Sequence, residues 1–355
     1  MRNYILVTGG HHSSAVPLIK LFLKDNFKVV FMGHKYASVL NNYVSSEYKE
    51  ITALGIKYVN LSTSKFYGVK GIKKYFKILY SIFWCLTYLT INRPKLVLSY
   101  GGYLAVPVVI AAKILFIKVY THEQTLTLGL ANKLIQHFAK VIFVSWPESV
   151  NKNKKSKLVG LPLREEIINA NIKKLGPNYS FKTIYIQGGK QGSHELNNFV
   201  FKNIDYLCKN FIIYHQTSKH SANTDYEQAK ALSKKYKNYH PFEFIYGKDY
   251  TELLNKSDLI LSRSGAHIVY EVSYLKIPTI FVPLPFASQN EQYKNAVNAQ
   301  NYLPCEVIEQ KNLNIKSFVT KINSLLLKSK QVKTYNNVES DSTNIMYKII
   351  CSDLK

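Results

Sequence analysis

Short apolar runs that end in glycine or polar turns recur along the chain, and stretches with helical spacing separate them. Apolar runs of this length are typical of buried strands. Strands that alternate with helices predict a parallel sheet with helices on both faces. In the first half of the chain the apolar runs span residues 4–10, 27–33, 95–102, 118–124 and 140–146.

The same pattern starts again in the second half. The segment TIYIQGGKQGSHE at residues 183–195 repeats the design of LVTGGHHSSAVP at residues 6–17, which is a strand, two glycines, a polar turn and a helix. The predicted fold class is therefore α/β, with two Rossmann-like domains facing each other across a cleft. Folds of this kind bind ligands at the carboxyl ends of their strands. Further strands are expected at residues 211–218, 242–247, 257–265 and 278–285.

A polar and basic segment, NKNKKSKLVGLPLREE at residues 151–166, marks the joint between the two domains. We expect an N-terminal domain over residues 1–158 and a C-terminal domain over residues 159–330. The tail, residues 331–355, is polar and has a short helical end at 343–351. This tail is expected to pack back on the N-terminal domain.

The chain is strongly basic, with 47 lysines and arginines against 22 acidic residues and a formal charge of +25. This charge suggests an anionic membrane surface or a phosphorylated substrate as partner, although a general bias toward Lys, Asn, Ile and Tyr offers another origin. The basic residues follow no zinc-finger or RNP-like spacing, so we expect no nucleic acid. Four cysteines without a CxxC pair fit a reducing cytoplasm, and no signal peptide is expected.

An apolar run, ILYSIFWCLTYLTI at residues 78–91, follows a group of lysines. A membrane-spanning helix needs about 20 apolar residues, and this run is shorter. It is either a buried core helix or a helix that lies on a membrane. In the second case its aromatics point inward and its lysines face anionic head groups. The membrane patch would then include Lys73, Lys74, Lys77, Phe83 and Trp84.

The most informative stretch is SDLILSRSGAHIVYEVSYLKIPTIFVPLP at residues 257–285. A strand ends there, Gly265 allows a sharp turn, and a helix begins. Free N–H groups at such a helix start bind phosphate, aided by the helix dipole. Glu271 lies about one turn inside the helix and can reach toward sugar hydroxyls. The alternative is that Glu271 is a solvated helix carboxylate.

Three other segments carry candidate binding residues. The turn QGGKQGS at residues 187–193 allows close backbone approach, and Lys190 adds a positive charge. Arg164 in GLPLR follows the joint, where it either clamps a diphosphate or is a surface arginine. The segment THEQT at residues 121–125 either lines the cleft or caps the following helix.

Several motifs are missing, and their absence narrows the function. The sequence has no GxxxxGK[ST], which argues against an NTPase, and no complete GxGxxG with a following acidic residue, which argues against a nicotinamide dehydrogenase. It also has no Asp-x-Asp to hold a divalent cation against a nucleotide diphosphate. We therefore expect no metal and no cofactor.

Taken in order, these motifs resemble those of the MurG family of peptidoglycan N-acetylglucosaminyltransferases over roughly residues 4–310. No single motif is specific, but the ordered set is. The matching segments are TGGH (8–11), SYGGY (99–103), HEQ (122–124), GLPLR (160–164), GGKQG (188–192), HQT (215–217), SRSGAHIVYE (262–271) and NEQYKNA (290–296).

This resemblance implies a GT-B glycosyltransferase that is inverting and independent of metal. It implies transfer of GlcNAc from UDP-GlcNAc to the muramoyl 4-hydroxyl of undecaprenyl-linked lipid I, which gives lipid II for peptidoglycan synthesis, cell wall biogenesis, cell shape and cell division. The enzyme would sit peripherally on the cytoplasmic face of the plasma membrane. Alternatives are another GT-B UDP-sugar transferase for exopolysaccharide or glycolipid synthesis, a UDP-GlcNAc 2-epimerase, or a non-enzymatic adaptor.

The resemblance also implies roles for individual residues. Within the donor set, Ile245 would contact uracil, Glu271 the ribose and Gln292 the donor sugar. The donor-binding residues would be Thr8, Gly9, Gly10, Arg164, Lys190, Gln191, Gly192, Ile245, Gly265, Ala266, His267, Ile268, Glu271 and Gln292. The acceptor-binding residues would be Gly101, Gly102, Tyr103, His122, Glu123, Gln124 and Thr125.

His11 is the expected catalytic base, because an imidazole with an ordinary pKa of about 6.5 accepts a proton readily at cytoplasmic pH. The alternative for a histidine in a turn is a hydrogen bond to the backbone. The loop is shorter than in the family, so His12 is a second candidate for the base. Thr125 and Lys190 stand where the family has Asn and Ser, which leaves the acceptor and the fine donor choice open.

Overall fold

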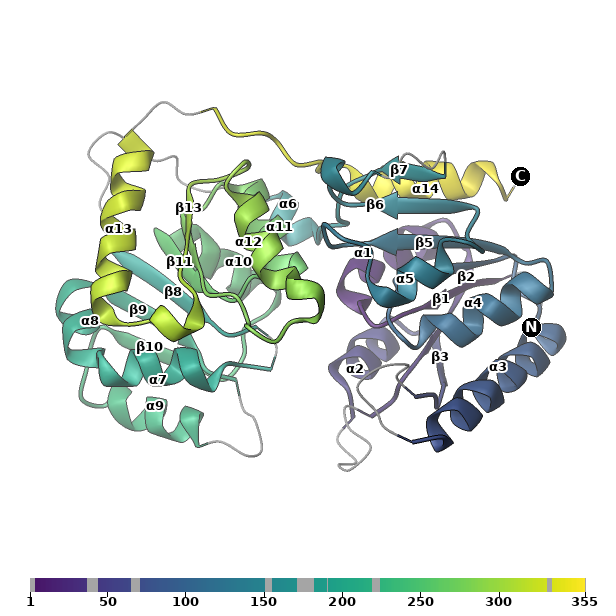
Figure 1. Cartoon of the computed structure of the whole chain (residues 1–355), viewed down its shortest axis with the longest axis horizontal. Helices are drawn as coiled ribbons and strands as arrows, with labels where there is room; N and C mark the ends of the chain where they lie inside the picture. Colours follow the sequence, from purple (N-terminus) through teal and green to yellow (C-terminus); the bar gives the residue numbers. More distant parts are fainter. Residues whose placement is uncertain are drawn as a thin grey trace. The chain divides into compact units, whose positions relative to one another are not determined.

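The structure of the protein is a computed structural model that describes residues 4–36, 44–64, 71–150, 155–170, 182–189, 191–218, 224–330 and 334–354. The chain divides into two compact units. The first unit comprises Met1–Arg164 and Glu339–Lys355, and the second comprises Glu165–Val338. Figure 1 follows the chain through both units.

The boundaries between the units differ from those expected at residues 158 and 330. Val159, Leu161 and Leu163 are buried, and Gly160 accepts a hydrogen bond from the ring of His122, so this segment belongs to the first unit. At the other end, the backbone N–H of Asn336 bonds a carbonyl of the second unit. Because of these contacts, the first boundary lies after Arg164 and the second lies after Val338.

Within its described residues, the first unit holds a parallel seven-stranded sheet in the order β3-β2-β1-β4-β5-β6-β7. The predicted strands of this unit are present, while β3 and β7 were not predicted. The elements are β1 (Tyr4–Thr8), α1 (His12–Lys24), β2 (Lys28–Gly33), α2 (Ser46–Ala53), β3 (Lys57–Asn60), α3 (Lys73–Ile91), β4 (Leu96–Ser99), α4 (Ala105–Ile114), β5 (Lys118–Glu123), α5 (Leu130–Ile135), β6 (Val141–Val144), η1 (Pro147–Ser149), β7 (Ser156–Leu158) and α14 (Ser342–Ser352).

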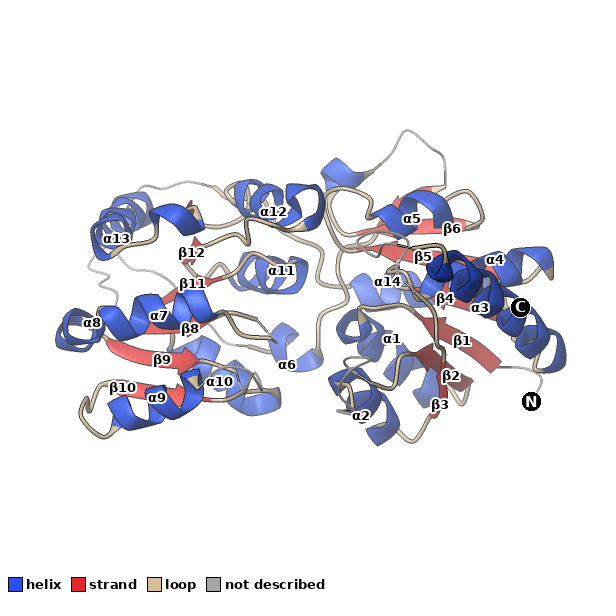
Figure 2. Ribbon diagram, turned by 60° about the horizontal axis from the view of Figure 1, so that its bottom comes forward, coloured by secondary structure: helices blue, strands red, loops and turns tan. Residues whose placement is uncertain are grey.

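Helices cover both faces of this sheet (Figure 2). Side chains of a strand alternate between the two faces, so β1 contributes Leu6 to one core and Val7 to the other. The core on the Leu6 face includes residues of α3, α4 and α5. The core on the Val7 face includes residues of α1 and of α14, the helix at the end of the chain.

The C-terminal helix α14 completes the core of the first unit. Met346 and Ile350 are fully buried there, and α14 packs against α1. Asp353 forms an ion pair with Lys140 at 2.5 Å and accepts a hydrogen bond from the hydroxyl of Tyr120. The last helix is thus fastened by apolar burial along its length and by polar contacts at its end.

The second unit, in its described residues, holds a parallel six-stranded sheet in the order β10-β9-β8-β11-β12-β13. Its elements are α6 (Glu165–Ile168), β8 (Thr183–Gln187), α7 (His194–Lys202), α8 (Ile204–Asn210), β9 (Ile212–Gln216), α9 (Asp225–Ser233), β10 (Tyr239–Phe242), α10 (Gly247–Lys256), β11 (Leu259–Ser262), α11 (Ala266–Leu275), β12 (Thr279–Phe281), η2 (Ser288–Asn290), α12 (Glu291–Ala299), β13 (Cys305–Val307), η3 (Gln310–Asn312) and α13 (Ile315–Lys330).

One strand of this unit lies elsewhere than predicted. The strand expected at residues 242–247 is β10, which spans Tyr239–Phe242, and the chain after Phe242 is a loop that leads into α10. The side chain of Tyr239 is buried, whereas those of Phe244 and Tyr246 are exposed. The apolar residues of FEFIYG therefore do not form a core strand. Strand β13 was not predicted.

Both sheets have the strand order of a Rossmann fold. Successive strands are added on one side of the first strand and then on its other side, and this order reverses between β1 and β4 in the first unit and between β8 and β11 in the second. Ligands of open α/β sheets bind at such reversal points, outside the carboxyl ends of the strands. The turns that follow these four strands are therefore candidate binding turns. They contain TGGH, SYGGY, GGKQG and SRSGAH.

Candidate functional site

The turn after β1 is shaped by a close approach to the turn after β4. Gly9 has φ +128°, and a Cβ at this position would lie 2.8 Å from the carbonyl oxygen of Gly101. The N–H of Gly10 donates to the same carbonyl at 3.2 Å. Only glycine fits at residue 9, and the two turns hold each other in place.

Thr8, the last residue of β1, is completely buried. Its hydroxyl donates to the carbonyl of Met32 at 2.9 Å, which ties β1 to β2. The hydroxyl therefore stabilises the sheet end from which the turn emerges. The predicted donor contact of Thr8 stays a prediction.

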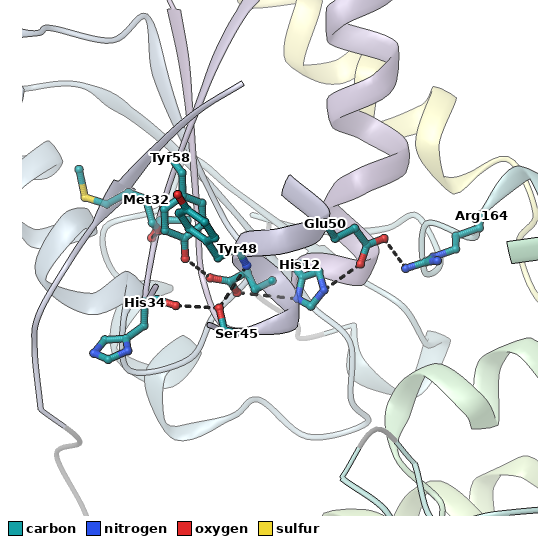
Figure 3. A network of polar contacts seen from close by, with 10 residues as sticks. His12, Met32, His34, Ser45, Tyr48, Glu50, Tyr58 and Arg164 are labelled. Atoms are coloured by element: carbon teal, nitrogen blue, oxygen red, sulfur yellow. Dashed lines mark hydrogen bonds and ion pairs between the residues drawn. The ribbon is translucent and has the colours of Figure 1, made fainter. Parts of the chain in front are cut away.

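The two adjacent histidines lie in different surroundings. His11 precedes α1 and is exposed, while His12 is the first residue of α1 and is 6% exposed. The Nε2 atom of His12 lies 3.0 Å from Oε2 of Glu50, and its Nδ1 atom lies 3.8 Å from Oε2 of Glu47 (Figure 3). The structure thus commits the ring of His12 to carboxylates of α2 and leaves His11 as the solvent-accessible imidazole of this turn.

The segment after β5 is held by its own side chains. Glu123 is buried and accepts hydrogen bonds from the N–H groups of Gln124, Thr125 and Gly129, from the Thr125 hydroxyl and from the Asn132 amide. Gly129 is the residue that precedes α5. Glu123 therefore organises the loop that leads into α5, while among the described residues no side chain caps the first turn of this helix. Acceptor contacts of residues 122–125 stay a prediction.

Buried polar atoms gather near this segment. His122 is fully buried, its Nε2 atom lies 2.9 Å from the Gly160 carbonyl, and burial lowers its pKa to about 4. The ring of Tyr100 lies 5.8 Å from that of His122. The Tyr100 hydroxyl, His122 Nδ1 and both polar atoms of the Gln124 amide have no hydrogen-bond partner among the described residues. Such atoms are unusual in a folded interior and mark a place for water or a ligand.

The loop at residues 160–164 brings Arg164 to α2. Residues 159–163 are buried, and Arg164 emerges from them with its side chain 31% exposed. Its Nη2 atom donates to Oε1 of Glu50 at 2.6 Å (Figure 3). Glu50 was not singled out from the sequence, because nothing in the spacing of residues 50 and 164 indicates that they meet.

In the second unit, the turn after β8 is also built on glycine. Gly192 has φ +74°, and a Cβ there would lie 2.6 Å from the carbonyl oxygen of Thr217. Gln191 is exposed, and Ser193 caps α7 through the N–H of Leu196. Lys190 lies outside the described residues, so the structure does not place its side chain.

A buried arginine that no sequence motif indicated connects this turn to two other loops. Arg263 donates to the Ser193 hydroxyl at 2.7 Å, to the Gln310 amide oxygen at 2.7 Å and to the Val282 carbonyl at 3.0 Å. Burial lowers the pKa of its guanidinium to about 10. Arg263 therefore helps to hold the turns after β8, β11 and β12 together.

The start of α11 has the form expected of an anion site. Gly265 precedes the helix, and Ala266, His267 and Ile268 form its partly exposed first turn. The N–H groups of a first turn have no partner within their own helix. In the residues that lead up to the helix, the buried hydroxyls of Ser262 and Ser264 have no hydrogen-bond partner among the described residues. This combination suits a phosphate group.

Gln292 supports the same region from α12. Its side-chain oxygen accepts a hydrogen bond from the N–H of Leu284 at 2.9 Å and from that of Ser264 at 3.4 Å. The amide oxygen of Gln292 thus holds two loops at the end of the sheet. The predicted contact of Gln292 with a sugar stays a prediction.

Glu271 is held in place by a tyrosine that the sequence did not reveal. Glu271 is partly exposed, and the hydroxyl of Tyr250 in α10 donates to its Oε2 atom at 2.8 Å. Nearby, the N–H of Ile245 donates to the side-chain oxygen of Gln216 at 3.3 Å. The carboxylate of Glu271 is therefore oriented and not simply solvated, which agrees with a binding role.

Helix α3 has one buried face, as the core interpretation predicts, and the membrane interpretation of its apolar run stays a prediction. One face packs into the core through Ile78, Cys85 and Leu89, and Trp84 is partly buried against this core. The opposite face is exposed and apolar, comprising Ile72, Tyr75, Phe76, Leu79, Tyr80 and Phe83, which are each 55% to 70% exposed. Among the described helices, none is long and apolar enough to cross a membrane.

Lysines accompany the exposed face of α3. Lys73 is exposed, and Lys74 and Lys77 are partly exposed in the first turns of the helix. The ammonium group of Lys74 lies 4.9 Å from the centre of the Tyr75 ring. In the part of the chain that the structure describes, no group of three or more His, Cys, Asp or Glu side chains is arranged to hold a metal ion.

Comparison with known proteins identifies related sequences over nearly the whole chain. Residues 7–144 match the glycosyltransferase family 28 N-terminal domain, and residues 183–350 match its C-terminal domain. A UDP-N-acetylglucosamine--N-acetylmuramyl-(pentapeptide) pyrophosphoryl-undecaprenol N-acetylglucosamine transferase of Staphylococcus aureus (strain MRSA252) is 31% identical, covering 94% of this chain and 92% of the relative. A protein of the same name from Clostridium botulinum (strain Langeland / NCTC 10281 / Type F) is 31% identical, covering 90% and 88%.

Solved structures share the fold. MurG of Acinetobacter baumannii has a TM-score of 0.71 and 21% identity, covering 99% of each chain. A UDP-GlcNAc 2-epimerase from Neisseria meningitidis has a TM-score of 0.64 and 17% identity, covering 99% of this chain and 100% of that chain. At these identities, the likeness establishes the architecture alone.

Two parallel-sheet domains that match both halves of family 28 define the class: the protein is a glycosyltransferase with the GT-B architecture. Within that class, the chain belongs to the MurG family, to which the S. aureus and C. botulinum transferases belong. The resemblance that the ordered motifs suggested is thereby confirmed.

Proposed function

We propose that the protein transfers N-acetylglucosamine from UDP-GlcNAc to the muramoyl 4-hydroxyl of an undecaprenyl-diphosphate-linked muramoyl peptide. The product is the lipid-linked disaccharide, lipid II, of peptidoglycan synthesis. The observation that carries this proposal is the 31% identity to the S. aureus transferase over 94% of the chain. The glycine turns at the reversal points of both sheets are consistent with it.

The family resemblance implies the donor roles, and the described geometry supports those of the α11 start and of Glu271. The first turn of α11 binds the diphosphate, because its N–H groups and the helix dipole favour an anion. Glu271, oriented by Tyr250, accepts hydrogen bonds from the ribose hydroxyls. Ile245 contacts the uracil, Gln292 contacts the sugar through its amide, and Arg164 and Lys190 add positive charge at the diphosphate.

In the proposed reaction, the oxygen of the acceptor hydroxyl attacks the anomeric carbon while the bond from that carbon to the UDP oxygen breaks. His11 takes the proton of the hydroxyl as the new bond forms. The departing UDP gains negative charge, which the helix start of α11 and the cationic side chains stabilise. Attack from the side opposite to the leaving group inverts the anomeric centre.

The lipid-linked acceptor requires the enzyme to reach a membrane. We place the protein peripherally on the cytoplasmic face of the plasma membrane, with the exposed face of α3 in the head-group region. The apolar side chains of this face supply hydrophobic burial, and Lys73, Lys74 and Lys77 attract anionic lipids.

Incubation with radiolabelled UDP-GlcNAc and synthetic lipid I tests the proposal. Label should enter the lipid fraction only when both substrates are present. Label that stays in the nucleotide fraction as an epimerised UDP-sugar would favour a 2-epimerase, whose fold is also similar. Transfer to another lipid-linked or polysaccharide acceptor, with none to lipid I, would agree with a UDP-sugar donor. It would contradict the proposed acceptor.

A further inference from the structure

His12 has no part in the proposed reaction, although it is buried at the turn where His11 acts. Its ring is directed at α2, where Nε2 lies 3.0 Å from Oε2 of Glu50. The two residues are 38 positions apart in the sequence. Figure 3 shows the ring of His12 on one side of Glu50 and the guanidinium of Arg164 on the other.

Glu50 uses both carboxylate oxygens in this arrangement. Oε2 faces His12, and Oε1 accepts from Nη2 of Arg164 at 2.6 Å. The side chain of Glu50 is only 30% exposed. A carboxylate held from one side presents its second oxygen in a defined direction, and charge-assisted hydrogen bonds of this kind are the stronger ones in proteins.

The helix that carries Glu50 is itself well fixed. Ser45 accepts a hydrogen bond from the N–H of Tyr48 at the start of α2. Glu47 accepts from the hydroxyl of Tyr58 in β3 at 2.6 Å, and the rings of Tyr48 and Tyr58 pack edge to face at 4.9 Å. The position of Glu50 is therefore set by contacts that extend to the sheet.

Arg164 is anchored at its backbone and open at its side chain. It follows a buried loop that His122 fastens through the carbonyl of Gly160. Among the described residues, its guanidinium bonds Glu50 through one nitrogen, and the side chain remains 31% exposed. A guanidinium carries further N–H donors in a planar fork that suits phosphate oxygens.

We propose that Glu50, supported by His12, is a positioning residue that fixes the guanidinium of Arg164 so that its other N–H groups bind the diphosphate of the UDP-sugar. An arginine side chain without a partner loses rotamer freedom when it binds a ligand, and this loss weakens binding. An arginine already held by a carboxylate has lost that freedom before the ligand binds. This inference rests on the proposed function, which assigns that ligand to Arg164.

Calorimetric titration with UDP and with uridine tests the proposal, because only UDP carries the diphosphate. Arg164→Ala should weaken UDP binding by at least about 10-fold and leave uridine binding unchanged. Glu50→Leu should weaken UDP binding by about 2- to 10-fold, the scale for immobilising one flexible side chain, again without effect on uridine. The double variant should bind UDP as Arg164→Ala does, because Glu50 acts only through Arg164.

Glu50→Gln separates positioning from charge. Glutamine keeps an acceptor oxygen at the same reach, so this variant should retain most of the UDP affinity that Glu50→Leu loses. Thr52→Val is the matched control on α2, because among the described residues the Thr52 hydroxyl bonds backbone carbonyls of its own helix and no side chain. Its UDP affinity should equal that of the unaltered protein, and circular dichroism should show all variants folded.

Enzyme kinetics give a second readout. His12→Ala should raise the KM for the donor by a few-fold while kcat stays nearly unchanged, because His12 steadies Glu50 and moves no proton. Unchanged or tighter UDP binding in Glu50→Leu would overturn the positioning role, since Glu50 would then be inert or would compete with the diphosphate. Unchanged UDP binding in Arg164→Ala would instead overturn the assignment of the diphosphate to Arg164, and the inference with it.

Discussion

At the scale of single residues, two adjacent histidines have different fates. His12 starts a helix, and its buried ring lies beside two carboxylates of α2. His11 stays exposed at the carboxyl end of β1. The match to TGGH favours His11 as the base, and the shortened loop makes His12 the second candidate. Accessibility separates them, because a base must reach the proton that it removes.

Replacement of His11 by Ala should lower kcat by about 10²–10⁴-fold, the usual range for the loss of an acid–base group. The Kd for UDP should barely change, because the proton moves only in the transition state. Steady-state kinetics with lipid I and calorimetry with UDP measure the two effects. A dead His12→Ala beside an active His11→Ala would reverse the assignment, and full activity in both would make the histidines structural.

Glu271 is the second residue whose role can be isolated. Glu271→Ala should weaken UDP binding by about 1–3 kcal/mol, the scale for losing a hydrogen bond to a charged group. Tyr250→Phe should have a smaller effect of the same sign, because it releases the carboxylate without removing it. Calorimetry measures both changes.

The exposed carboxylate of Glu252 on the same helix as Tyr250 provides the control for Glu271. Glu252→Ala should bind UDP normally. Normal binding by a folded Glu271→Ala variant would remove Glu271 from the donor site, whatever the behaviour of Tyr250→Phe.

At the scale of elements, α3 has a buried stripe and an exposed apolar stripe on the same helix. Its buried stripe packs against α4, and its exposed stripe is too apolar for an ordinary solvent-facing helix. Contiguous exposed apolar patches mark interaction surfaces. The lysines at the start of the helix favour an anionic partner for this one.

Changing Lys73, Lys74 and Lys77 to Glu should therefore reduce sedimentation with anionic vesicles, since each basic residue near the surface contributes about 1 kcal/mol. Binding by the unaltered protein should also weaken as salt is raised. Phe83→Ser should reduce binding with less dependence on salt, because it removes apolar burial only.

A matched charge change elsewhere distinguishes this patch from the overall charge. Lys230, Lys234 and Lys237 are exposed in and after α9, and their change to Glu alters the net charge equally. Vesicle binding should survive that change. Equal losses in the two triple variants would mean that the net charge of the chain, and not α3, attracts the membrane.

At the scale of the whole molecule, the end of the chain returns to the unit in which the chain began. Helix α14 fills part of the core beside α1, so the first unit is complete only when residues 339–355 have packed onto it. The second unit consists of one continuous segment. Folding of the first unit thus depends on contacts between residues more than 300 positions apart, such as Tyr347 and Asp25.

Ile350→Ala should lower the free energy of unfolding of the first unit by about 2–5 kcal/mol, because Ile350 is completely buried and its loss leaves a cavity. Lys348→Ala, an exposed position on the same helix, should change it by less than about 0.5 kcal/mol. Urea unfolding monitored by circular dichroism measures both. Similar stabilities for the two variants would contradict a core role for α14.

The sequence by itself determined most of the fold and the turns that make up the candidate site. Buried strands carry an apolar run and a turn signal within a few residues, so they can be recognised locally. Two strands in the second unit show the limits, because FEFIYG is apolar but lies mainly in a loop and β13 has only three residues. The glycine turns were recognisable for the same reason, since glycine permits backbone conformations that other residues avoid.

Only the tertiary structure decided what individual side chains do. His12 meets Glu50 across 38 positions, Arg164 meets Glu50 across 114, and Tyr250 meets Glu271 across 21. Glu123 likewise turns out to organise its loop, a role that depends on the path of the backbone around it. A local pattern of residues records which segments are buried, but hydrogen-bond partners are chosen by the folded arrangement that brings distant segments within about 3 Å of one another.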